Sequence, residues 1–378
     1  MPRFLRPKHT KHASGTPAKS KGADKPFLFA LVGLSLFGLL SVFNASVVSA
    51  FRDFGNEYHF IQNQATFLLV GFILCFVISR IDYRKWYGLA IPLLFVTLVL
   101  LLAVFIPGIG VGALGAKRWI NLGFTTLQPT EFAKLALVVY LSAWFSNRER
   151  GRFLPFLTLL GILVGLVILQ PDLGTAIIIT IIALVLYFIS GAPFVHFGLL
   201  VPVVATALGI LAIAAPYRFA RVTTFLNPNA DPLGSSYHVR QILLGLGSGG
   251  WFGVGLGKSR QKYEYLPEAN SDSIFAIIGE EIGFIGAVVL ICIFVFFIYR
   301  IFAISRRAPD RFGQLLASGI GSWLAIQTLI NLGSMVSLIP LTGVPLPLIS
   351  NGGSNLLALL IGFGIVLNIS RQAIKVKH

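Results

Sequence analysis

Residues 282–299 read Ile-Gly-Phe-Ile-Gly-Ala-Val-Val-Leu-Ile-Cys-Ile-Phe-Val-Phe-Phe-Ile-Tyr and contain no charged side chain. About 20 such residues in a helix cross the roughly 30 Å hydrocarbon core of a bilayer. Charge returns immediately outside the stretch, at Glu281 and Arg300. The stretch therefore predicts a transmembrane helix.

Similar apolar runs occur along most of the chain and give ten candidate spans. They cover residues 27–47, 59–79, 87–107, 129–146, 154–170, 173–191, 195–215, 272–299, 312–336 and 351–370. Hydrophobic residues make up 56% of the 378 residues and charged residues only 12%, against about 25% charged in soluble domains. We therefore predict an all-α polytopic membrane protein of about ten transmembrane helices.

Basic residues predict the orientation of these spans. Twenty of the 30 Lys and Arg residues lie in the segment up to Lys25, in the connections 80–85, 148–152 and 300–311, and in the C-terminal tail. Because Lys and Arg concentrate on the cytoplasmic side, both termini are predicted to lie in the cytoplasm. The membrane is predicted to be the inner membrane of a bacterium. This placement accounts for most of the +16 net charge, so the charge does not indicate a nucleic-acid partner.

The chain divides into one large domain and two tails. Residues 1–26 are basic and rich in Pro, Ser and Gly, which predicts a disordered cytoplasmic tail. Residues 27–372 form the predicted membrane domain, and residues 373–378 a second cytoplasmic tail. We expect one long extracellular loop, residues 217–271, between the seventh and eighth spans.

This long loop carries cations that the orientation rule does not explain. An anionic ligand near the outer surface is favoured over attraction to lipid headgroups. The six cations are Arg218, Arg221, Arg240, Lys258, Arg260 and Lys262. The loop also contains a G-x-G-x-x-G pattern at residues 245–250 and Gly257-Lys258-Ser259, but neither has the strand–turn–helix context of a nucleotide site.

Acidic residues at membrane depth are costly and usually functional or paired. Glu131 and Lys134 are three residues apart, so they can pair on one helix face, and a structural pair is favoured. Asp172 begins the sixth span and is placed to cap it. Glu280 and Glu281 either bind neighbouring helices or line a cavity.

Asp272 opens the eighth span and closes the long basic loop. This position puts a carboxylate at the membrane–water boundary, facing the cationic cluster. Either a catalytic role or simple capping of the helix by Asp272 or Ser271 fits the position.

Several stretches, in this order along residues 27–372, resemble the shape, elongation, division and sporulation (SEDS) family of peptidoglycan glycosyltransferases. Within that family the resemblance is greatest to its division branch, while the elongation and sporulation branches stay open. The stretches are residues 115–123 (GAKRWINLG), 128–131 (QPTE), 170–175 (QPDLGT), 247–253 (GSGGWFG), 265–268 (YLPE), 279–283 (GEEIG) and 345–354 (PLPLISNGGS).

The resemblance implies an inverting glycosyltransferase that polymerises lipid II, a disaccharide-peptide on undecaprenyl pyrophosphate, into glycan strands outside the membrane. It implies that the essential aspartate is Asp272. The family's His-Thr-Asp-Phe-like stretch is Asn270-Ser271-Asp272-Ser273 here, so the flanking His and Phe are absent. We expect Asp272 to act as general base for the acceptor hydroxyl, with Glu268 as the next candidate.

The leaving pyrophosphate needs cations more than it needs a proton donor. The candidates are Lys117, Arg118, Lys258, Arg260 and Lys262, with a divalent cation (Mg or Mn) as a further candidate. Supporting polar roles are expected for Glu131, Lys134, Asp172, Glu268, Glu280, Glu281 and Ser350.

The expected partners are lipid II, the growing glycan strand, membrane lipid, a class B penicillin-binding protein that cross-links the strands, and other division or elongation proteins. Two other functions stay open at this point. One is a flippase for lipid-linked sugars, which the intramembrane acids would serve. The other is a non-catalytic scaffold of a cell-wall complex.

Overall fold

The computed structural model describes residues 22–113, 116–123, 125–147, 151–214, 216–227, 234, 236–263 and 265–373. Outside the described residues lie most of the predicted tail 1–26, nearly all of the C-terminal tail 373–378, and Asp231 and Glu264 of the long loop. The backbone of Arg218 is described, but its side chain is not. The described chain forms twelve helices and one small sheet.

Ten of the twelve helices coincide with the ten predicted spans. They are α1 (Lys25–Phe54), α2 (His59–Ile78), α3 (Lys85–Ala103), α4 (Pro129–Ser146), α5 (Phe153–Leu169), α6 (Leu173–Ile189), α7 (Phe194–Ala214), α10 (Ile274–Arg306), α11 (Arg311–Met335) and α12 (Gly353–Gln372). By length and composition seven helices can cross a membrane, and α5 and α6 are shorter apolar helices. The main differences are that α1 and α10 run several residues past their predicted ends.

Two elements of secondary structure were not predicted. The long loop contains two short helices, α8 (Pro216–Leu226) and α9 (Tyr237–Ser248). A three-stranded antiparallel sheet of order β1-β2-β3 occupies the connection between α3 and α4. Its strands are β1 (Gly110–Ala113), β2 (Ala116–Asn121) and β3 (Thr126–Leu127).

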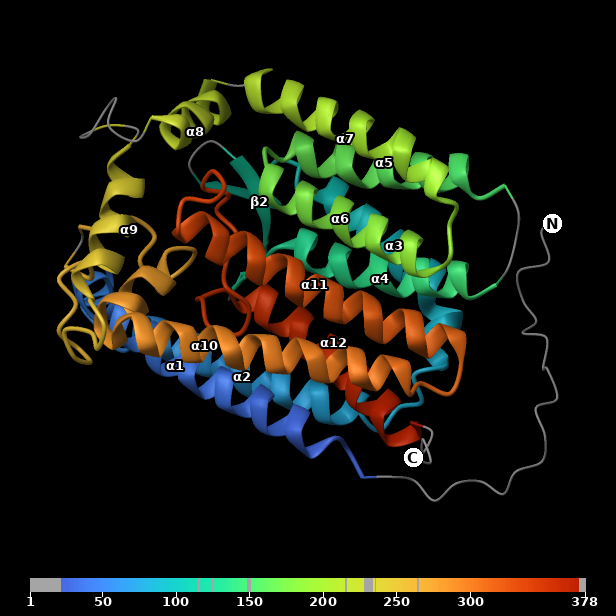
Figure 1. The fold of residues 1–378 in the computed structure, drawn as a ribbon, viewed down its shortest axis with the longest axis horizontal. Helices are drawn as coiled ribbons and strands as arrows, with labels where there is room; N and C mark the ends of the chain where they lie inside the picture. The colour runs from blue at the N-terminus through green and yellow to red at the C-terminus, as the bar shows by residue number, and fades with distance from the viewer. Residues whose placement is uncertain are drawn as a thin grey trace.

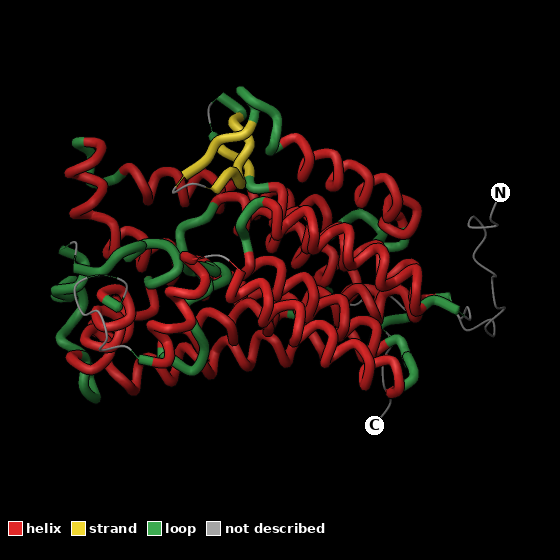
Figure 2. The backbone as a smooth tube through the Cα atoms, turned by 90° about the horizontal axis from the view of Figure 1, so that it is seen from above, coloured by secondary structure: helices red, strands yellow, loops and turns green. Residues whose placement is uncertain are grey.

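The helices run side by side, and the small sheet sits at the margin of the bundle (Figure 2). The centre is formed by α11 and α12, whose most apolar windows are each 83% buried. In contrast, only 6% of the most apolar window of α7 is buried. Helices α1, α2 and α3 also present large apolar side chains outward. Such an outward apolar surface is what a bilayer solvates, so these helices form the lipid-facing layer.

One end of the bundle gathers the basic connections predicted to share a side. Asp24 pairs with Arg300, Arg84 Nε lies 3.1 Å from Asp310 Oδ2, and Arg371 donates to the carbonyl of Ser79. The opposite end carries α8 and α9 (Figure 1). The spans therefore alternate as the charge pattern predicts.

Candidate functional site

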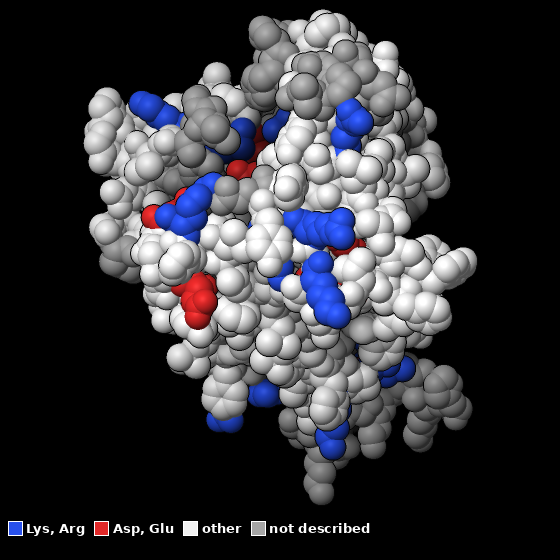
Figure 3. All heavy atoms as spheres, turned by 90° about the vertical axis from the view of Figure 1, so that its left-hand side faces the viewer, with Lys and Arg blue, Asp and Glu red and all other residues white. Residues whose placement is uncertain are grey.

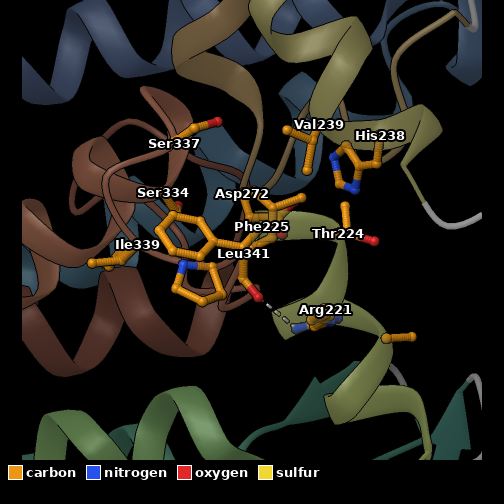
Figure 4. Close-up of a pocket in the computed structure, with 12 residues that line it drawn as sticks. Arg221, Thr224, Phe225, His238, Val239, Asp272, Ser334, Ser337, Ile339 and Leu341 are labelled. Atoms are coloured by element: carbon orange, nitrogen blue, oxygen red, sulfur yellow. Dashed lines mark hydrogen bonds between the residues drawn. The ribbon is translucent and has the colours of Figure 1, made fainter. Parts of the chain in front are cut away.

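A cavity of about 260 Å³ opens at the end of the bundle that carries α8 and α9. Its polar lining includes Asp272, Arg221 and His238, which three different elements supply (Figure 4). The remaining wall is largely apolar, with Phe225 and Leu341 among its residues. The cavity thus combines a carboxylate, a guanidinium and an imidazole with a surface suited to hydrocarbon.

A tight turn positions Asp272 just before α10. The carbonyl of Glu268 accepts hydrogen bonds from the backbone N–H groups of Ser271 and Ser273, at 3.1 and 3.2 Å. The backbone carbonyl of Asp272 accepts a hydrogen bond of 2.8 Å from Asn331 Nδ2 of α11. These bonds fix the backbone of Asp272 and leave its side chain directed at the cavity.

The capping alternative does not describe Asp272. Ser273 is the N-cap of α10, and Asp272 precedes it. The Asp272 carboxylate has a long contact of 3.5 Å from its Oδ1 to Ser271 Oγ and a local hydrogen bond from its own backbone N–H. The carboxylate therefore keeps acceptor capacity for a ligand in the cavity.

The surroundings of this carboxylate favour its protonated form. Burial raises the pKa of Asp272 to about 7, the negative charge of Glu268 adds to the rise, and Arg221 opposes it. A general base works best when its pKa lies near the operating pH. Asp272 is therefore poised to take up and release a proton near neutral pH.

Arg221 is the cation that the fold brings to Asp272. It lies on α8, and its Nη1 donates a 3.1 Å hydrogen bond to the carbonyl of Leu341. A β-carbon built on Gly343 would lie 3.7 Å from Asp272 Oδ2 and 3.9 Å from Arg221 Nη1. Arg221 is one of the six cations of the outer loop, but it was not among the predicted site residues, because its distance from Asp272 in the chain gives no sign of contact.

The two candidate cations of β2 lie elsewhere. Arg118 Nε donates to the carbonyl of Gln170 at 3.1 Å, and its Nη2 donates to that of Pro171. Arg118 thus ties the sheet to the turn between α5 and α6. Lys117 is exposed. The described lining of the Asp272 cavity includes neither residue.

The other three candidate cations follow α9 in a loop that is also outside the described cavity lining. Lys258 and Arg260 are exposed. Lys262 Nζ donates to Asn44 Oδ1 at 3.1 Å and lies 4.0 Å from Glu281 Oε1. Lys262 is thereby engaged in holding the loop to the bundle.

Glu280 and Glu281 are the anchors of that loop. Glu280 accepts hydrogen bonds from Ser248 Oγ at 3.3 Å and from the backbone N–H of Arg260 at 3.1 Å. Glu281 accepts one from the backbone N–H of Ser259 at 3.3 Å. Both residues therefore bind the loop. Glu280 also contacts α9 through Ser248, and Glu281 contacts α1 through Asn44, so the predicted binding of neighbouring helices is confirmed in part. The rejected G-x-G-x-x-G pattern begins within helix α9, so it is not a strand–turn–helix site.

Glu131 and Lys134 form the predicted buried pair inside α4. Lys134 Nζ lies 2.8 Å from Glu131 Oε2 and donates to Gln327 Oε1 at 3.0 Å. Asn355 Nδ2 donates to the same Glu131 carboxylate. The four side chains join α4, α11 and α12, which supports the structural interpretation.

The last three supporting residues make local hydrogen bonds. Asp172 caps α6, since its Oδ1 accepts from the N–H of Thr175 at 3.0 Å. Ser350 Oγ accepts from the N–H of Leu346 at 2.8 Å. Glu268 Oε2 accepts from Ser271 Oγ at 2.7 Å, which couples Glu268 to the Asp272 turn.

Most of the face at this end of the molecule is uncharged, and its charged side chains are more often basic than acidic (Figure 3). Within the described part of the chain, no three His, Cys, Asp or Glu residues form a group that could hold a metal ion. The divalent cation named above therefore stays a prediction.

Fold and site define a multi-span membrane protein with a cavity at one end of its bundle that Asp272 and Arg221 help to line. Residues 25–375 match the family described as "Cell cycle protein", that of FtsW, RodA and SpoVE. The chain belongs to the FtsW/RodA/SpoVE family, as the resemblance predicted.

Curated relatives match along nearly their whole length. The probable peptidoglycan glycosyltransferase FtsW of Trichlorobacter lovleyi is 41% identical over 354 residues, which cover 92% of this chain and 93% of that protein. Stage V sporulation protein E of Bacillus subtilis is 39% identical and covers 94% of this chain and 99% of its own.

Solved structures share the fold. A chain of a peptidoglycan synthase complex, described as coordinating polymerization and crosslinking, superposes with a TM-score of 0.76 at 29% identity, covering 92% of this chain and 98% of that chain. RodA of Thermus thermophilus, a rod shape determining protein, superposes with a TM-score of 0.69 at 29% identity, covering 93% and 98%.

Proposed function

We propose that this chain is a peptidoglycan glycosyltransferase that polymerises lipid II into glycan strands, with its role in septal wall synthesis during division. The observation that carries the proposal is the enclosed Asp272 carboxylate beside Arg221 in a cavity of a family member. The naming of relatives as peptidoglycan glycosyltransferase FtsW supports the reaction class and the division role.

The reaction is a single inverting displacement. Asp272 accepts the proton of the acceptor sugar hydroxyl, and the oxygen attacks the anomeric carbon of the donor. The bond from that carbon to the pyrophosphate oxygen breaks, and undecaprenyl pyrophosphate leaves with the electron pair. A placed carboxylate base contributes typically about 10²–10⁴-fold.

Arg221 takes the role that we had expected of Lys258, Arg260 and Lys262. The leaving pyrophosphate gains negative charge as the bond breaks, and a guanidinium can bind two of its oxygens at once. Phe225, Ile339 and Leu341 give the cavity an apolar wall for the first prenyl units.

The orientation follows from the basic connections gathered at the other end of the bundle. We place both termini in the cytoplasm of a bacterial cell and the Asp272 cavity on the outer face of the inner membrane. A transpeptidase of the class B penicillin-binding type is the proposed partner. The similarity to a chain of a peptidoglycan synthase complex supports such an assembly.

The test is lipid II polymerisation by the purified protein with its transpeptidase partner, comparing the wild type with Asp272→Asn. Glycan strands from the wild type alone would support the polymerase and the base. Strands from both proteins would keep the polymerase and reject Asp272, with Glu268 as the next candidate. Strands from neither, despite a folded complex and added divalent cations, would reject the proposal in favour of a flippase or a scaffold.

A further inference from the structure

His238 of α9 is hydrogen bonded to the residue that follows Asp272. Its Nε2 lies 2.7 Å from Ser273 Oγ, and Ser273 is fully buried. A serine at an N-cap usually accepts a hydrogen bond from the first turn of its own helix, but Ser273 has no such bond. Its hydroxyl is instead committed to the imidazole, so this bond links α9 to the start of α10.

The imidazole stays neutral at physiological pH. Burial lowers the pKa of His238 to about 4, and the positive charge of Arg221 lowers it further. A neutral imidazole has one donor and one acceptor nitrogen. The link to Ser273 therefore persists unchanged across the pH range in which the Asp272 carboxyl titrates.

Two side chains thus hold the turn at Asp272, one from a helix that precedes it in the sequence and one from a helix that follows it. Asn331 of α11 holds the backbone carbonyl of Asp272 at 2.8 Å, and His238 holds Ser273. The carboxylate itself is held only locally, by the long contact from Ser271 and by the backbone N–H of Asp272. Its direction is therefore set by the backbone on either side, so a change at His238 is transmitted to the carboxylate.

We propose that His238 is a positioning residue for Asp272: through Ser273 it fixes the carboxylate in the orientation needed to reach the acceptor hydroxyl. Its role in turnover rests on the proposed function. Ser273 stands where the family stretch has Phe, so the hydroxyl that binds the imidazole is a feature of this chain.

The charged and titratable groups around Asp272 bear on the test. Glu268 faces it from its own turn and Arg221 from α8, and His238 faces it from α9. The side chain from α11 is the uncharged Asn331, and residues 337–350 contain no charged side chain. A shift in the titration of Asp272 caused by a change at His238 can therefore be separated from the effects of Glu268 and Arg221 by matched variants.

The experiment compares His238→Ala, His238→Gln, Ser273→Ala and the double variant His238→Ala/Ser273→Ala in the partnered full-length protein. A matched control is His196→Ala, since His196 Nδ1 lies 2.6 Å from a hydroxyl, that of Tyr187, and His196 lies on α7 outside the cavity lining. Steady-state kinetics give kcat and KM for lipid II. The pH-difference infrared spectrum, minus that of Asp272→Asn, gives the titration midpoint of the Asp272 carboxyl without need of activity.

We expect His238→Ala to lower kcat about tenfold with little change in KM, as for a reacting group that loses its orientation. The Asp272 midpoint should move from about 7 toward its ordinary value, because water gains access to the carboxylate. Ser273→Ala should reproduce both effects, and the double variant should be no worse than either single one. Glutamine keeps a donor and an acceptor, so His238→Gln should recover most of the loss.

An unchanged kcat and midpoint in His238→Ala would overturn the proposal, as would losses that add up in the double variant without any shift of the midpoint. If His238→Ala does not fold, Ser273→Ala and His238→Gln decide the same question. If the wild type makes no glycan strands, the proposed function fails, while the infrared midpoints still decide whether His238 positions Asp272.

Discussion

The Asp272 carboxylate and the Arg221 guanidinium converge on Gly343, a residue with no side chain to separate them. A β-carbon there would stand 3.7 Å from Oδ2 and 3.9 Å from Nη1. Gly343 also has a φ of +70°, in the left-handed region that favours glycine. The backbone at Gly343 therefore borders the space between Asp272 and Arg221.

Replacing Gly343 with Ala should reduce both activity and stability. The added methyl group would take up space beside Asp272 and Arg221, at ordinary contact distance from both, and the left-handed backbone costs about 1–2 kcal/mol for a residue with a β-carbon. Gly55→Ala is the matched control, because Gly55 has a φ of +64° and open space around it. Thermal unfolding should show a similar loss for both variants, and lipid II polymerisation should fall only for Gly343→Ala. Equal activity in the two variants would mean that the space at Gly343 is not used.

The pH dependence of turnover should report the Asp272 carboxyl. The base must be ionised to accept a proton, so kcat should rise with pH through about 7 and level off above it. Glu268→Gln removes the neighbouring negative charge that raises the pKa of Asp272. The rising acid limb of the plot of kcat against pH should therefore move to lower pH. A limb that stays in place in Glu268→Gln would assign it to another group.

The same shift fixes the sign of the effect on stability. Asp272 has a higher pKa in the folded state than the ordinary value of 3.8, so the folded state binds more protons between about pH 4 and 7. The contribution of Asp272 to the free energy of unfolding therefore falls as pH rises through that window. Asp272→Asn lacks this term, so unfolding temperatures at pH 5.5 and 8 should differ less in the variant than in the wild type. An equal difference in both proteins would contradict the raised pKa.

Arg221 should matter more than the basic residues of the loop after α9. Arg221→Gln removes the charge facing the leaving pyrophosphate, and the loss of one such group costs about 10²–10³-fold in kcat. It should also move the acid limb to higher pH, because Arg221 lowers the pKa of Asp272. Lys258→Gln is the control, since Lys258 is exposed and outside the cavity lining. A larger loss in Lys258→Gln than in Arg221→Gln would return the pyrophosphate to that loop.

Hydrophobic runs were sufficient to predict ten helices, because burial in lipid demands about 20 apolar residues per span. The same reasoning could not find α8 or α9, whose polar residues at the bundle end give no such signal. The place of Asp272 at the end of a basic loop fitted either a catalytic role or helix capping, and the family resemblance selected the catalytic role. Its neighbours His238, Arg221 and Asn331 were not predicted, because contacts between distant segments depend on how the helices pack.

The predicted cations lie outside the cavity lining for a related reason. Counting charges in a loop treats its Lys and Arg residues as equivalent, but Lys262 is engaged by Asn44 and Glu281, while Arg118 is bound to backbone carbonyls. A buried acid such as Glu281 binds a nearby cation, here Lys262, and that cation then serves the packing of the loop. The cation left to face Asp272 comes from α8, a helix that hydropathy did not reveal.

The Glu131–Lys134 pair should contribute to stability rather than to turnover. Lys134 is 1% exposed, so Lys134→Met leaves Glu131 as an unpaired buried charge, which costs about 3–5 kcal/mol. The double variant Glu131→Gln/Lys134→Met removes both charges and should recover much of that loss. Lys117→Met, at an exposed position, is the control and should leave the unfolding temperature in detergent unchanged. Polymerase activity per folded molecule should survive in the double variant. If stability survives in Lys134→Met while activity is lost, the pair belongs to the reaction or to a path through the bundle.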